Sequence, residues 1–195
     1  MTLMAVAIIS VNAQDGRMKR EHVRHYEAES YRSSVATNVV DWAMFGTING
    51  SGSFAVNRYW TLNATIKYNP WTWNAQDAST QINQKQQTYL AGAQYWPWTV
   101  YSGWWLGAYG QYSEYNRGGL WSKKTEEGDA MGVSLGFGYS LMLLKNINLG
   151  FGITGWGGQK NYVTYACPTC GKIIDSGSKG FVDLDTLLIS LELMF

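Results

Sequence analysis

The sequence is poor in long apolar runs and in charged residues. Beyond its first few positions it has no run of about 18 apolar residues, which excludes a membrane-spanning helix in the mature chain. Its 15 basic and 14 acidic side chains give a net charge of +1, which excludes a polyanion binder such as a nucleic-acid-binding protein. Charged residues make up 15% of the chain, whereas soluble domains have about 25%.

The chain is rich in aromatic residues and in glycine. It contains 10 Trp, 13 Tyr and 22 Gly, and its mean hydropathy is -0.22. Few charges combined with many aromatic side chains indicate a membrane protein. Because no helix is apolar enough to span a bilayer, the low hydropathy favours a β-barrel, whose alternating strands average out in any hydropathy window.

The N-terminal region predicts two segments outside the barrel. Residues 1–13 are apolar and end in small residues before Gln14, which is typical of a secretory signal peptide; the alternative is a buried first strand. Residues 14–34 carry five basic and four acidic residues, which predicts a solvated periplasmic segment. His22 and His25 lie three positions apart there, but two histidines without a further ligand do not make a metal site.

From residue 35 onward, apolar and polar side chains alternate with the period of a β-strand. Eight segments show this pattern, at about 35–47, 49–56, 60–69, 86–96, 103–114, 131–141, 147–154 and 187–195. No charged residue occurs in 86–113 or in 130–144, which a soluble β-sandwich would rarely allow. The sequence therefore predicts that residues 35–195 form an all-β fold, an eight-stranded antiparallel transmembrane β-barrel of the outer membrane.

The connections between these segments alternate in length. Residues 57–59, 97–102 and 145–146 form short links, whereas 70–85, 116–129 and 157–180 form long ones. Barrels of the bacterial outer membrane have short periplasmic turns and long outer loops. This pattern places the N-terminal charged segment and Phe195 on the periplasmic side.

An eight-stranded barrel has an interior that side chains can fill. The alternation places Asp41, Lys67, Gln94, Gln111 and Glu192 inside, together with Tyr109. Ionisable groups in such a lumen usually pair with one another and hold the barrel closed, and conduction or catalysis is the alternative. We therefore expect a packed polar lumen.

Two resemblances support this interpretation. The final strand, with Leu191, Leu193 and Phe195, resembles the C-terminal signature that marks Gram-negative outer-membrane proteins for the barrel assembly machinery. The segments 36–41, 52–56, 60–63 and 68–71 (Tyr-Asn-Pro-Trp), with Tyr95-Trp96, resemble a family of small Bacteroidota-type outer-membrane barrels that carry a domain of unknown function.

That resemblance covers residues 36–195 and implies a barrel often encoded beside fimbrial genes, with no catalytic residues to carry over. The chain departs from the family's pattern in its long final outer loop, which bears two cysteines, and in having no peptidoglycan-binding domain after Phe195.

Cys167 and Cys170 enclose a Cys-Pro-Thr-Cys motif in the longest expected outer loop. A zinc ribbon would need a second pair of ligands nearby, and a thioredoxin-like dithiol would need a strand-to-helix turn. In an exported protein we expect a disulfide that closes a small loop, with a redox site as the alternative.

Trp71, Trp73 and Trp121 lie in or beside the expected outer loops. Exposed aromatic rings stack on sugars or anchor a protein partner, but they also serve as interfacial belt residues, which is the commoner role. They are the candidate surface-binding residues of the chain.

No enzyme activity is expected. An enzyme at the outer rim would need a polar cluster that combines histidine with a carboxylate or serine, and both histidines lie on the periplasmic side. The acidic residues of the outer loops, such as Glu126 and Glu127, lie beside Lys123 and Lys124, which is typical of a solvated loop.

The sequence thus predicts a structural or surface-interaction protein in the outer membrane of a Gram-negative bacterium, without a cofactor. The expected partners are outer-membrane lipid, lipopolysaccharide, the assembly machinery and fimbrial or other surface proteins, and not nucleic acid. The alternatives are a surface module that binds a glycan or a protein through its aromatic outer loops, and a narrow channel.

Overall fold

The computed structural model describes residues 31–76, 80–120, 123–169 and 171–195, in which a compact unit begins at Arg32. The elements of this unit are almost all strands: β1 (Ser33–Asn38), α2 (Val39–Ala43), β2 (Ile48–Ala55), β3 (Trp60–Asn69), β4 (Thr72–Trp73), β5 (Ile82–Tyr95), β6 (Gly103–Gly118), β7 (Thr125–Leu144), β8 (Ile147–Tyr165) and β9 (Ile173–Met194). The all-β prediction is confirmed. None of the helical residues within these ranges forms a helix long and apolar enough to cross a membrane.

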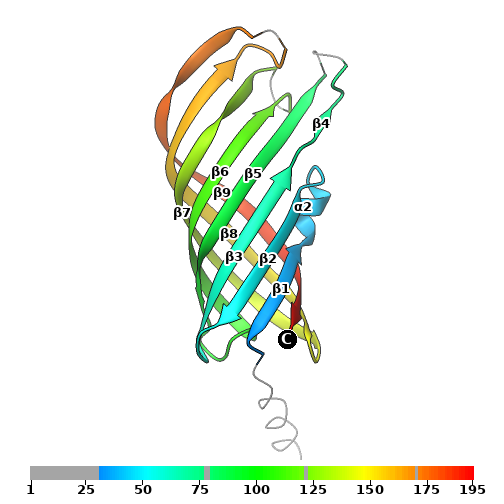
Figure 1. Cartoon of the computed structure of the whole chain (residues 1–195), viewed down its shortest axis with the longest axis vertical. Coiled ribbons are helices and arrows are strands. Elements are labelled where there is room, and N and C mark those ends of the chain that lie inside the picture. Colours follow the sequence, from blue (N-terminus) through cyan, green and yellow to red (C-terminus); the bar gives the residue numbers. More distant parts are fainter. Residues whose placement is uncertain (1–30, 77–79, 121–122, 170) are drawn as a thin grey trace, which may run out of the picture. The chain divides into compact units, whose positions relative to one another are not determined.

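The strands form one closed, antiparallel ring (Figure 1). Each strand pairs with the next strand along the chain, except that β3 pairs directly with β5. The first and last strands, β1 and β9, also pair and close the ring. Two-residue β4 adds only a short ladder to β5. The ring therefore contains eight strands, as the alternation predicts.

The pairing register is staggered around the ring. Ala36 on β1 is linked through successive strand partners to Phe181 on β9, yet Ala36 itself pairs with Glu192, eleven positions further along β9. One of those positions, Asp185, is the extra residue of a β-bulge. A stagger of this kind means that the strands are tilted relative to the axis of the ring.

The ring has a polar interior and an apolar exterior. On β7, Met131, Val133 and Leu135 are 66%, 58% and 63% exposed, while Ser134 between them is fully buried. Among the described residues, polar side chains outnumber apolar ones at buried positions. This distribution is the reverse of the usual soluble core, in which aliphatic side chains fill the interior.

The interior also contains aromatic side chains that depend on small neighbours. Trp105 is 5% exposed and lies against glycines of β7 and β8. A Cβ atom at Gly138 would lie 2.5 Å from the Trp105 ring and 2.3 Å from the Phe151 carbonyl oxygen. The glycines that alternate along β7 therefore make the space that the indole ring occupies.

Two of the three predicted long outer loops, 116–129 and 157–180, are wrong over most of their length. β8 continues to Tyr165 and β9 begins at Ile173, so the expected loop 157–180 is largely a hairpin, and β6 and β7 likewise extend into 116–129. Figure 1 shows these strands reaching far from the end at which β1 begins. The sequence did not reveal them because most of their side chains are polar or glycine, which removes the alternation.

The predicted first strand, 35–47, is also wrong in its second half. β1 ends at Asn38, and Val39–Ala43 form the short helix α2. The side-chain oxygen of Asn38 accepts a hydrogen bond from the Val40 backbone N–H and caps this helix. Because Val39 and Val40 are β-branched, their intrinsic preference favoured a strand, and the cap overrides it.

Candidate functional site

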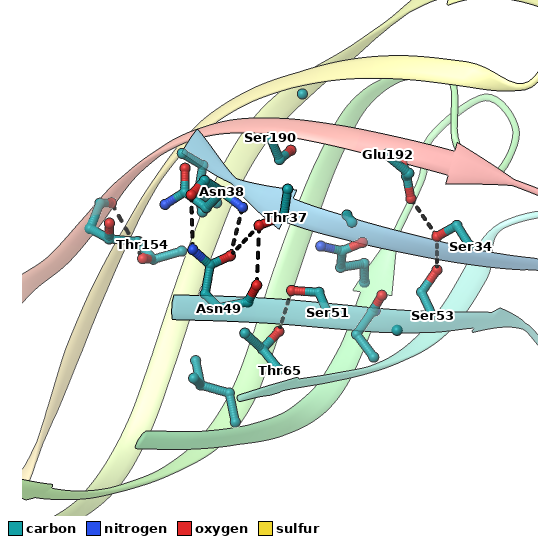
Figure 2. Close-up of a pocket in the computed structure, with 18 of the residues that line it drawn as sticks. Ser34, Thr37, Asn38, Asn49, Ser51, Ser53, Thr65, Thr154, Ser190 and Glu192 are labelled. Carbon is teal, nitrogen blue, oxygen red and sulfur yellow. Dashed lines mark hydrogen bonds between the residues drawn. The ribbon is translucent and has the colours of Figure 1, made fainter. Parts of the chain in front are cut away.

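The candidate site is the polar chamber inside the ring, a cavity of about 120 Å³. Serine, threonine and asparagine are the commonest residues around it, and most of these lie on β1, β2 and β9 (Figure 2). A cavity of this size with polar walls has room for several water molecules. Ionisable side chains lie at two places in its wall, at Lys67 and at Glu192.

Lys67 is the centre of an ion triad. Its Nζ atom lies 3.1 Å from Asp185 Oδ2 on β9 and 3.6 Å from Asp41 Oδ2 on α2. The three side chains are 8%, 11% and 10% exposed. With one positive and two negative formal charges out of water, the triad depends on the lysine for its charge balance.

Neutral side chains donate further hydrogen bonds to the carboxylates of the two aspartates. The Thr186 hydroxyl donates to Asp41 Oδ1 at 3.0 Å, Gln111 Nε2 donates to Asp185 Oδ1 at 3.1 Å, and the Thr154 hydroxyl donates to Asp185 Oδ2 at 3.2 Å. The triad thus connects α2, β3 and β9 directly and reaches β6 and β8 through these bonds. It ties together strands from opposite parts of the ring.

The structure places the five predicted lumen residues in the interior wall but divides them into separate groups. Asp41 and Lys67 belong to the triad, and Gln111 reaches it through Asp185. Gln94 instead donates to the Tyr109 hydroxyl at 2.7 Å. Glu192 accepts a hydrogen bond of 2.5 Å from Ser34, which also contacts Ser53, as Figure 2 shows.

Asp185 is the functional residue that the sequence reasoning missed. Thr154 pairs with Thr186 but the next residue, Gly155, pairs with Leu184, so Asp185 is bulged out of the register. The bulge reverses which residues face inward. A signal was present, because the outward leucines at 184 and 187 are three positions apart instead of two.

The seam between β1 and β9 is completed by side-chain amides (Figure 2). Asn38 Nδ2 donates to the Leu187 carbonyl oxygen at 3.2 Å, and Asn38 Oδ1 accepts from the Ile189 N–H at 3.0 Å. Asn49 Oδ1 accepts from the Asn38 N–H at 2.7 Å, and Asn49 Nδ2 donates to the Asn38 carbonyl oxygen at 2.9 Å. These amides replace backbone pairing at the point where β1 ends.

Asn49→Ala is expected to lower the free energy of unfolding by about 1–3 kcal/mol, because it leaves the buried N–H and C=O of Asn38 without partners. Urea unfolding of the folded protein measures this change. Asn63→Ala is the matched control, since Asn63 also lines the chamber but bonds only to Thr61 on its own strand. Equal stability of the two variants would contradict the role assigned to Asn49.

The chamber is blocked near the short connections. Trp96 and Tyr101 are each 2% exposed, and the Trp96 indole N–H donates to Thr61 Oγ1 at 3.2 Å. Asn148 Nδ2 donates to the Tyr101 carbonyl oxygen at 2.6 Å. Large side chains at this end and the triad within the ring leave a chamber and not a wide channel.

A second cavity, a groove of about 620 Å³, lies at the far ends of β3, β5, β6 and β7. Tyr68 and Tyr112 line it together with the carboxylates of Glu114, Glu127 and Asp129. Neutral groups hold these carboxylates: the Tyr112 hydroxyl donates to Glu114, for example, at 2.9 Å. Aromatic rings and oriented polar groups in one groove are features of ligand sites.

A charged cluster joins the outer parts of β6, β7 and β8. Glu126 accepts hydrogen bonds from the Tyr115 hydroxyl and from Lys160 Nζ. Burial alone would raise the pKa of Glu126, but these two hydrogen bonds outweigh it and hold the pKa below its usual value. The Lys160 ammonium also lies 5.8 Å from the Tyr162 ring centroid. These contacts hold together the outer parts of β6, β7 and β8, where few side chains are apolar.

The predicted loop residues are not gathered into one site. The Trp71 indole N–H donates to the Gly46 carbonyl oxygen at 3.0 Å, and Trp73 lies on β4 with 49% of its surface exposed. Cys167 is disulfide-bonded. Its predicted partner Cys170 lies outside the described residues, as do Trp121, His22 and His25. No group of three or more potential metal ligands occurs in the described part of the chain.

The predicted assembly residues lie on the last strand. Leu191 and Leu193 face outward from β9, and Phe195 follows the strand. The Phe195 N–H donates to the Ser33 carbonyl oxygen at 2.9 Å, and its own carbonyl oxygen accepts from the Ser33 N–H at 3.0 Å. The backbone of Phe195 therefore completes the pairing between β9 and β1.

Comparison with known proteins adds a family but no activity. A family model described as a protein of unknown function, DUF3575, matches residues 2–195. None of the curated proteins matches the chain.

Proposed function

Since the chain belongs to the DUF3575 family, whose function is unknown, we propose its role from the ring itself: a non-enzymatic β-barrel of the Gram-negative outer membrane. Its role is structural, or it interacts with other molecules at the cell surface. Association with fimbrial or other envelope assemblies rests on the resemblance of its sequence segments alone.

The observation that carries this proposal is the apolar outer face of a ring with a polar interior. Exposed aliphatic side chains cover the middle of the strands, and aromatic side chains lie beyond them. Trp60 and Tyr95 contact each other at 5.2 Å between ring centroids, and Trp104 stacks on Phe137 at 5.0 Å, towards the short connections. An apolar band bordered by aromatic residues is typical of proteins that sit in a bilayer.

The interior supports a structural role over conduction. Asp41 and Asp185 share the ammonium group of Lys67 across the ring, and Trp96 and Tyr101 fill its other end. A lumen filled in this way matches a barrel of eight strands, which leaves no wide diffusion path. The proposed partners are outer-membrane lipid and lipopolysaccharide on the outer face, and the barrel assembly machinery during insertion.

The test is to isolate the outer membrane and to compare boiled and unboiled samples by gel electrophoresis in dodecyl sulfate. A membrane barrel is expected in the outer-membrane fraction, with a faster-migrating folded form that disappears on boiling. Recovery of the folded protein in the soluble fraction would overturn the proposal.

A second candidate function is ligand binding at the groove beside Tyr68 and Tyr112. Its volume of about 620 Å³ and its lining of tyrosine rings, three carboxylates and one cation, Lys85, favour a neutral or cationic ligand, such as an uncharged glycan. Titration of the detergent-folded protein with fluorescent neutral oligosaccharides tests this function, and the absence of binding would remove it.

A further inference from the structure

One edge of β9 has no strand beside it over a long stretch. β9 pairs with β8 from Ile173 to Leu193, whereas β1 pairs with it only from Ser190 to Met194. Asn38 extends the contact to Leu187, and Asp41 extends it to Thr186. From Asp185 back towards Ile173, no described strand pairs with this edge, and Figure 1 shows α2 ending well short of the far end of the ring.

The bulge determines which backbone groups face the free edge. Leu187 and Ile189 direct their C=O and N–H groups to the β1 side, and these directions alternate along a strand. Because Asp185 shifts the register by one residue, Val182 and Leu184 present their backbone groups to the free edge. The Leu184 N–H agrees with this assignment, since it bonds to the side chain of its neighbour, Asp183 Oδ1, at 2.8 Å.

The side chains along this edge are also available. Val182 is 92% exposed and Leu184 is 57% exposed on the outer face. Lys179 and Asp183 are exposed and point to the opposite face, where the Lys179 ammonium lies 4.3 Å from the Tyr162 ring centroid and Asp183 Oδ1 accepts the Leu184 N–H. The edge therefore offers an apolar face, a charged face and a row of N–H and C=O groups beside which no described strand lies. Of these groups, the Leu184 N–H is capped by the side chain of Asp183.

We propose that the free edge of β9, residues 178–184, is a docking site for an extended segment of a partner protein. Only an extended polypeptide supplies N–H and C=O groups at the spacing of this edge, and strand addition of this kind is a general mode of peptide recognition. Charge complementarity places an acidic residue of the guest opposite Lys179 and a basic residue opposite Asp183. Alternate guest residues are apolar and extend the surface of Val182 and Leu184.

A second copy of the chain does not fit this edge in a shared membrane. Antiparallel pairing of two β9 edges in one continuous sheet requires a two-fold axis perpendicular to the sheet. That axis would turn the second ring upside down relative to the first, whereas barrels in one membrane share one orientation. The docking proposal itself does not depend on membrane insertion, because it rests on the pairing of β9.

The probe is a synthetic nine-residue peptide that alternates valine with polar residues, with a lysine and a glutamate placed to face Asp183 and Lys179. Its affinity for the detergent-folded protein is measured by fluorescence anisotropy. Val182→Pro removes an N–H from the free edge without removing a bond to β8, and we expect it to weaken binding about tenfold or more. Val182→Ala keeps that N–H and is the matched control, with an expected change of less than about threefold.

Two further readouts keep the proposal open to refutation. Circular dichroism and the unfolding midpoint establish whether Val182→Pro is folded. If it is not folded, the wild-type protein is tested with a second peptide that is N-methylated on the residues facing the edge. This second peptide must fail to bind while the unmodified peptide binds. Equal affinity of the wild type and the folded Val182→Pro, or no binding to either, overturns the proposal. A dimer that forms without peptide and is lost in Val182→Pro assigns the edge to a second copy instead.

Discussion

Lys67→Met is expected to lower the free energy of unfolding by about 3–5 kcal/mol, which is the usual cost of removing one partner of a buried ion pair. The methionine fills a similar volume but leaves the carboxylates of Asp41 and Asp185 without their cation. Both are about one-tenth exposed, so water screens the two negative charges only weakly. Urea unfolding of the protein in lipid vesicles measures the change.

The matched controls distinguish charge from packing. Asp185→Asn removes one negative charge and leaves Lys67 paired with Asp41, so we expect a smaller loss than in Lys67→Met. Neutralising all three positions together, with Lys67→Met, Asp41→Asn and Asp185→Asn, should restore much of the stability, because no uncompensated charge remains. If the triple variant is as unstable as Lys67→Met, the loss comes from packing and not from charge.

The triad also explains why a ring with one short strand stays closed. β1 forms only five residue pairs with β9 and four with β2, fewer than any other two neighbouring strands of the ring. The amides of Asn38 and Asn49 lengthen this seam, and Asp41 on α2 crosses it to reach Thr186 and Lys67. A helix that carries the aspartate thus replaces the strand that the sequence appeared to contain, and it joins β3 to β9 through the interior.

The alternation of apolar and polar side chains predicted the ring because each strand has one apolar and one polar face, and the apolar faces of neighbouring strands lie side by side. It also identified Lys67 as an inward residue, since inward positions on a strand follow from parity alone. Asp41 faces inward for a different reason, because it lies on α2 and not on the expected strand. Parity failed at Asp185, where one extra residue moves a side chain from one face to the other. The residue type at position 185 does not reveal the bulge. The only sign of it in the sequence is that the outward residues Leu184 and Leu187 are three positions apart instead of two.

The outer ends of the strands were missed for a different reason. Beyond the apolar band most side chains of β8 and β9 are polar or glycine, so the sequence there resembles a loop although the backbone pairing continues to Tyr165. Their order comes from contacts between charged and aromatic side chains, such as Lys160 with Glu126 and Lys179 with Tyr162. Contacts between residues this far apart in the chain cannot be inferred from periodicity.

Leu135→Arg is expected to cost about 2–4 kcal/mol in lipid vesicles if the outer face contacts the hydrocarbon core of a bilayer. Leu135 is 63% exposed in the middle of β7, among apolar neighbours on the same face. On a surface that faces water, the same substitution would change stability by no more than about 0.5 kcal/mol. The expected penalty is therefore a measure of what surrounds the ring.

Gln159→Arg on β8 is the matched control for this prediction. It is exposed like Leu135 but lies beyond the apolar residues of its strand, where an arginine in a bilayer would cost only about 0–1 kcal/mol. The difference between the two variants removes any general effect of adding a positive charge. If Leu135→Arg costs no more than Gln159→Arg, the apolar face is not in lipid and must be covered by protein instead, since an apolar band of this extent is not stable in water.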